Sequence, residues 1–144
     1  MKWVTRKQIR VNRTATAWLI KRFIDPAAEF FFVEPREAAA FEKTQNAVGF
    51  DAPQTKYSHT KGMTSFEQLM KEYRLNDPVL KEIARIVHGA DIAGQEKTTP
   101  ESAGLRAISH GFPLVTQNDH ETLEKAFFVY DALYASLKER LKGH

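Results

Sequence analysis

The clearest hydrophobic pattern in the chain runs through residues 118–141. Apolar side chains recur there in steps of three and four, at Leu123, Phe127, Tyr130, Tyr134, Leu137 and Leu141. This spacing is typical of a helix that buries one face. The same face extends back to His120, and Glu124 lies one turn further along the same side. The sequence therefore predicts a long final helix whose buried face begins with an imidazole and a carboxylate.

A second strongly patterned helix is predicted over residues 78–91. Asp77 followed by Pro78 is a common way for a helix to begin. The apolar positions of this helix are Leu80, Ile83, Ala84 and Val87, and the next position on that face is Asp91. A polar group at the end of a buried face needs a hydrogen-bond partner, an ion or a water-filled pocket, because burial alone costs free energy. Two predicted helices therefore place candidate ligands beside the core.

The remaining segments predict several short strands and helices. Residues 2–11 alternate loosely and predict a strand followed by a loop. Residues 29–33, with the sequence Glu-Phe-Phe-Phe-Val, predict a strand covered on both faces. Shorter strands are predicted at 47–50 and 56–59, and helices at 36–43 and 64–73.

Two further helices have clear boundaries. One is capped by Asn12 or Thr14 and runs to about residue 24, and the other covers residues 100–110. Gly111 is the expected end of the latter, because Pro113 cannot continue a helix. No repeat, linker or low-complexity segment interrupts the chain. The pattern predicts a single α+β domain over residues 1–144, predominantly helical with a small sheet of short strands.

The composition limits the disulfides, metal sites and membrane segments that the chain can form. The 144 residues carry a net charge of +3 and no cysteine, so disulfides and thiolate metal sites are excluded, and any metal must be held by His, Asp or Glu. No segment approaches the roughly 20 apolar residues needed to span a membrane. Without an apolar segment near residue 1, we expect no secretory signal and a cytoplasmic protein.

Histidine and carboxylate residues at three predicted element ends form a candidate metal site. His59 ends the predicted strand 56–59, and we expect it to meet Asp91, His120 and Glu124. Two imidazoles and two carboxylates suit zinc, iron or manganese as a divalent ion, with room for water or substrate. Glu121 is an alternative to Glu124, although it points about 100° away from His120 around the helix. The simpler interpretation is that each of these residues only makes local hydrogen bonds.

The basic residues are concentrated in residues 1–25. This segment holds Lys2, Arg6, Lys7, Arg10, Arg13, Lys21 and Arg22 against the single acid Asp25. Arg13 lies near a predicted helix N-terminus, where backbone N–H groups favour an anion. A guanidinium there suits an oxyanion or a carboxylate. The alternatives are a structural salt bridge for Arg13 and an ordinary solvated basic face for the segment.

Several separated blocks resemble the C-terminal domain of ChrB-type chromate-resistance proteins. They are the segment 12–26 followed by Glu29–Val33, and then Ser58-His59, Ser65-Phe66-Glu67, residues 86–91, Ala103-Gly104-Leu105, Asp119-His120-Glu121 and residues 130–134. The blocks keep the family's order and spacing over nearly the whole chain. The resemblance implies a role in chromate resistance, and we expect a C-terminal-type domain that stands alone.

These observations support three hypotheses. The first is a metal-binding protein of the chromate-resistance type, including a metalloenzyme of undefined reaction that acts on an anionic ligand. The second is a non-catalytic sensor or regulatory domain that binds a chromate-like oxyanion through Arg13. The third, a DNA-binding regulator, is the weakest, because no familiar nucleic-acid motif accompanies the basic face. The sequence specifies no oligomeric state.

Overall fold

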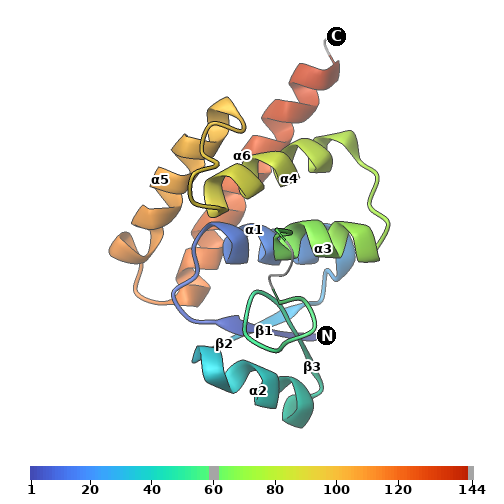
Figure 1. Cartoon of the computed structure of the whole chain (residues 1–144), viewed down its shortest axis with the longest axis vertical. Helices are drawn as coiled ribbons and strands as arrows, with labels where there is room; N and C mark the ends of the chain where they lie inside the picture. The colour runs from blue at the N-terminus through green and yellow to red at the C-terminus, as the bar shows by residue number, and fades with distance from the viewer. Residues whose placement is uncertain (59–61, 143–144) are drawn as a thin grey trace.

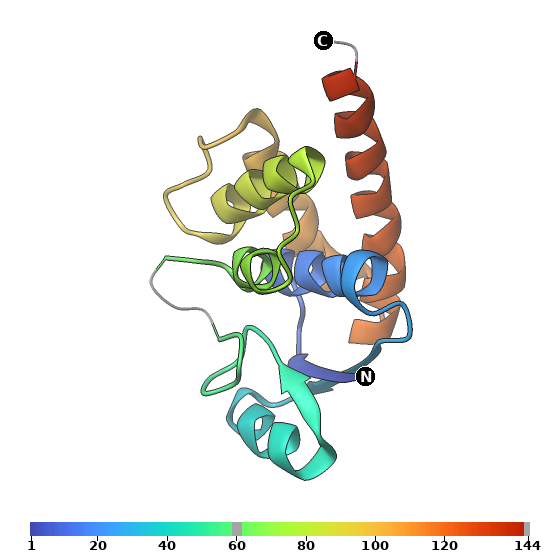
Figure 2. The same cartoon turned by 90° about the vertical axis from the view of Figure 1, so that its right-hand side faces the viewer.

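The computed structural model describes residues 1–58 and 62–142. A small sheet lies at one end of the molecule, with helix α2 (Ala38–Gln45) on one of its faces and helix α1 (Val11–Leu19) on the other (Figure 1). Figure 2 shows α1 and α3 (Ser65–Glu72) as a layer between the sheet and α4 (Pro78–Asp91). Helices α5 (Pro100–Val115) and α6 (Asp119–Lys142) complete the helical part. The predicted α+β class, predominantly helical with a small sheet, is confirmed.

The sheet is parallel and has the strand order β2-β1-β3. The central strand β1 (Lys2–Arg6) pairs Trp3 with Phe30 of β2 (Glu29–Val33) and with Val48 of β3 (Ala47–Gly49). Residues 3–5 of β1 are buried on both faces, as is usual for a strand in a parallel sheet. The edge strand β2 is less covered than predicted, since Phe30 is buried but residues 31–33 are only half-buried.

Helix α1 is the centre of the core. Almost all of its side chains are buried, because it packs against α3, α4, α5 and α6. Trp18 is enclosed by the rings of Phe23, Tyr130 and Tyr134. The predicted buried face of the final helix is confirmed at Leu123, Tyr130 and Leu137. Its predicted start at His120 and Glu124 is exposed, as is the helix end at Leu141.

Two predicted helix boundaries differ from the structure. Helix α1 begins at Val11, before either predicted cap, and Arg10 precedes it without a side-chain cap. Helix α5 continues through Pro113 to Val115, so the proline lies in its last turn rather than in its interior. The hydroxyl of Thr116 donates to the carbonyl of Phe112 in this turn at 2.8 Å.

The predicted strand 56–59 is reduced to one bridge between Phe50 and Tyr57 in its described part. Asp51 lies in the short turn that follows Phe50 and has φ +46°, so the chain leaves the sheet direction there. Within residues 1–58 and 62–142, no helix is long and apolar enough to cross a membrane.

Candidate anion-binding site

One buried carboxylate, Asp51, holds two arginines that come from different elements. Arg13 Nη1, in the first turn of α1, donates to Asp51 Oδ2 at 3.0 Å, and Arg13 Nη2 donates to the carbonyl of Gln8 at 2.9 Å. Arg6, at the end of β1, donates through Nε to the backbone oxygen of Asp51 at 2.9 Å. Its Nη2 lies 3.6 Å from Asp51 Oδ1. Two guanidinium groups against one carboxylate leave this cluster with an excess positive charge.

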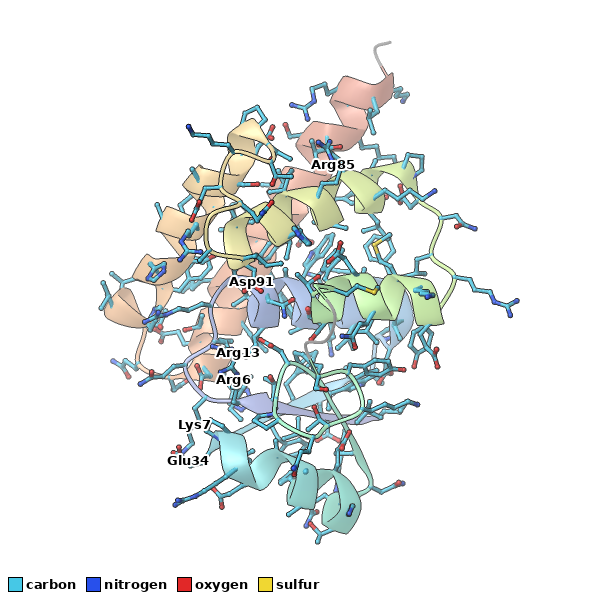
Figure 3. All side chains as sticks on the ribbon, viewed as in Figure 1. Arg6, Lys7, Arg13, Glu34, Arg85 and Asp91 are labelled. Atoms are coloured by element: carbon cyan, nitrogen blue, oxygen red, sulfur yellow. The ribbon has the colours of Figure 1, made fainter. Side chains whose placement is uncertain are left out.

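The two arginines border a cavity of about 270 Å³ where the end of β1, the start of α1, the end of α4 and the middle of α5 meet. Figure 3 shows Arg6, Arg13 and Asp91 lying along the same side of the molecule. The charged and polar residues that line the cavity are Arg6, Arg10, Asn12, Arg13, Asp91, Arg106, Ser109 and His110. Four guanidinium groups against one lining carboxylate make the cavity positive, and the N-terminal end of α1 adds to that potential.

The two other arginines are held differently. Arg106 donates through Nη1 to the carbonyl of Ala90 at 2.9 Å, and its Nε lies 3.8 Å from Glu96 Oε1. Arg10 is exposed, and its side chain makes no hydrogen bond or ion pair with the residues that the structure describes. Arg106 is therefore positioned by the protein, whereas the charge of Arg10 remains available to a ligand.

Buried polar atoms without a hydrogen bond gather at this cavity. In the described part of the chain they are Asn12 Nδ2, Arg13 Nε and Ser109 Oγ. Asn12 is only 2% exposed and uses its other amide atom, Oδ1, to accept from Thr16 at 3.1 Å. Leaving a buried donor unsatisfied costs about 1–3 kcal/mol. A ligand that accepts hydrogen bonds here would remove that cost.

The charges around Arg13 also favour an anionic ligand in this cavity. Burial lowers the pKa of Arg13 from its ordinary value, and the positive charge of Arg6 lowers it further. The carboxylates of Asp51 and Asp91 oppose this by raising the pKa. An arginine nevertheless stays protonated in proteins, so the cavity keeps a partly desolvated positive charge. Ser109 makes no well-formed hydrogen bond, although it lies close enough to the phenol of Tyr130 to lower the pKa of that group, which burial raises.

Two of the predicted metal ligands, Asp91 and His120, line different cavities. Asp91 lines the arginine cavity, whereas His120 lines another cavity of about 430 Å³ and lies edge-on to Phe32, with ring centroids 4.9 Å apart. Glu124 is exposed on α6, and His59 lies outside the described residues. No cluster of three or more His, Asp or Glu residues that could hold a metal occurs within residues 1–58 and 62–142. The four-residue metal site stays a prediction.

The alternative ligand Glu121 has a local role. Its Oε1 accepts from the backbone N–H of Gln117 at 3.2 Å, just before α6 begins. Two predicted site residues, Arg13 and Asp91, line the same cavity together with further candidate groups. Arg6 and Arg10 belong to the basic segment noted in the sequence. No sequence signal connected Asp51 or Arg106 with that segment, because both lie far from it along the chain.

Comparison with known proteins agrees with the blocks described above. The family model "ChrB, C-terminal domain" matches residues 3–137. The chain belongs to the ChrB C-terminal domain family. Protein ChrB of Cupriavidus metallidurans is 34% identical over 135 residues, which cover 92% of this chain and 39% of that protein. The ChrB-type domain thus spans about two fifths of the length of this curated relative. No solved structure matches the chain.

Proposed function

We propose that this ChrB-type domain binds a small tetrahedral oxyanion of the chromate type in the arginine cavity. The observation that supports this function best is the convergence of Arg6, Arg10, Arg13 and Arg106 on one cavity that also contains buried, unsatisfied donors. Guanidinium groups present flat pairs of N–H donors that match the oxygens of an oxyanion. The cavity of about 270 Å³ also exceeds the roughly 30 Å³ that a water molecule occupies in the liquid.

The protein holds three of these four arginines in place before a ligand arrives. Asp51 orients Arg6 and Arg13, and the carbonyl of Ala90 orients Arg106. An anion therefore meets side chains that have already lost part of their conformational freedom, which lowers the entropic cost of binding. Membership in the ChrB family supports chromate as the ligand class, and the role is that of a binding or sensing domain.

Calorimetric titration of the purified domain with chromate and with sulfate, at low ionic strength, tests this function. The most informative variant is Arg10→Met, because Arg10 has no structural partner among the described residues. Hydrogen bonds to charged groups contribute about 1.5–3 kcal/mol, so we expect Kd to rise roughly 10- to 100-fold. Arg85→Met is the matched control, since Arg85 lies on α4 outside the cavity and pairs with Glu82 at 3.0 Å.

Equal binding by the wild type and Arg10→Met, or no binding of either anion by the wild type, would refute the proposal. The same titration with duplex DNA addresses the nucleic-acid alternative, for which the affinity must fall steeply with salt.

The metal centre predicted from His59, Asp91, His120 and Glu124 is a separate proposal. It gives the domain a Lewis acid or an activated water if the ion is bound. Elemental analysis of protein purified without an affinity tag tests it, and an unchanged metal content in His120→Ala would remove the site as proposed.

A further inference from the structure

We infer that Asp91 makes the arginine cavity selective for an oxyanion that carries a proton, such as hydrogen phosphate or hydrogen chromate, over a fully deprotonated one such as sulfate. This inference rests on the proposed function and names the substrate class of the same site.

The cavity lining combines donors with one acidic acceptor. The start of α1 contributes Arg13 and Asn12, both donors with an unsatisfied N–H. The end of α4 contributes Ala90 and Asp91. The C-terminal end of a helix carries partial negative charge, and a carboxylate at this end adds a full one. An anion in the cavity therefore meets the carboxylate of Asp91 as well as the donors.

Asp91 and Arg13 are close enough to interact electrically, because the charge of Asp91 raises the pKa of Arg13. A ligand that bonds to Arg13 in this cavity therefore also lies in the field of Asp91. An ionised carboxylate is a pure acceptor with about four acceptor positions, so it accommodates a ligand O–H in addition to other partners.

Whether the contact with Asp91 is attractive or repulsive then depends on whether the ligand oxygen carries a proton. A protonated oxyanion oxygen donates a hydrogen bond to Asp91. An oxyanion without a proton places a charged oxygen next to a charged carboxylate, which is repulsive. A protonated oxyanion therefore gains a charge-assisted hydrogen bond with Asp91 that a fully deprotonated one cannot form. Because Asp91 is half-buried, we expect a preference of roughly 10- to 100-fold, the effect of one hydrogen bond to a charged group.

The first experiment compares phosphate and sulfate by calorimetry at neutral pH and constant low ionic strength. We expect the wild type to prefer phosphate by at least tenfold, and Asp91→Asn to bind sulfate at least tenfold more tightly than the wild type does. Glu82→Gln is the matched control, because Glu82 lies on the same helix, outside the cavity, and pairs with Arg85. This control should keep the wild-type preference.

The second experiment needs no variant, so it remains decisive if Asp91→Asn does not fold. Chromate and sulfate are titrated into the wild type across the pH range in which hydrogen chromate loses its proton. The other charged or titratable groups that line the cavity are Arg6, Arg10, Arg13, Arg106 and His110. Any change in the charge of these lining groups acts on both anions, so the ratio of the two affinities isolates the proton on chromate. We expect this ratio to fall as the pH rises.

Equal affinity of the wild type for phosphate and sulfate, an equal change in both affinities in Asp91→Asn, or a constant chromate-to-sulfate ratio would overturn the role of Asp91. In each case the proposed function stands, because anions still bind. Absence of binding for all three anions would instead remove both the proposed function and this inference.

Discussion

Replacing Asp51 by Asn tests whether one carboxylate holds the arginine cluster together. The side chains of Arg13 and Asp51 are 13% and 7% exposed, so their contact at 3.0 Å is largely shielded from water. Breaking such a pair typically costs 3–5 kcal/mol, because it leaves a buried charge without compensation. The pair with Arg6 adds little, since the Arg6 side chain is 40% exposed. Asparagine keeps one acceptor oxygen and tolerates the positive φ at this position.

We therefore expect Asp51→Asn to lower the free energy of unfolding by about 3 kcal/mol, slightly less than complete loss of the pair. For a chain of this length that corresponds to a fall in Tm of roughly 6–12 °C. Urea unfolding is followed by the fluorescence of Trp3 and Trp18, which are both fully buried. The control is Glu34→Gln, which removes an exposed ion pair with Lys7 of 3.3 Å that Figure 3 also displays.

A second readout connects this stability change with the cavity. Two arginines without their carboxylate attract an anion more strongly, so added sulfate should stabilise Asp51→Asn more than it stabilises the wild type. The reasoning is refuted if Asp51→Asn unfolds at the same urea concentration as Glu34→Gln. It is also refuted if sulfate stabilises Asp51→Asn and the wild type equally.

Three other predictions concern the packing around the site. Tyr130→Phe removes a buried hydroxyl that hydrogen-bonds to α1, and urea unfolding should show a loss of about 1 kcal/mol; an unchanged midpoint contradicts this. A hydrogen bond from Arg22, opposed only in part by burial, holds the pKa of Asp131 below its ordinary value. The stabilising contribution of Asp131 is therefore complete above the ordinary carboxylate pKa and is lost as the pH falls through the lower folded-state value. The Tm should therefore fall less steeply with decreasing pH for Asp131→Asn than for the wild type. A Cβ at Gly89 would lie 2.4 Å from Ser102 Oγ, whereas at Gly104 it would meet nothing within 4 Å. We expect Gly89→Ala to lower stability by about 1–3 kcal/mol and Gly104→Ala to raise it by roughly 0.5–1 kcal/mol; equal effects at the two positions would show that helix propensity alone decides.

The sequence by itself determined the elements whose pattern is local. The buried face of α6 and the start of α4 at Asp77 and Pro78 follow from contacts between residues three or four positions apart, or from a single cap. The aromatic strand β2 and the blocks that indicated the ChrB family were equally readable. Pro113 was misleading because it lies in the last turn of α5, followed only by Leu114 and Val115, so its ring and missing N–H affect a helix end rather than a helix interior.

The tertiary structure alone decided which candidate residues share a site. Arg13 and Asp51 are 38 positions apart, and Asp91 and Arg106 come from two further helices. No local periodicity relates such residues, because their distance depends on how α1 packs against the sheet, α4 and α5. The same packing placed Asp91 among arginines and His120 against Phe32. The helix faces were therefore encoded locally, whereas the composition of the cavity followed from the packing of segments distant in the chain.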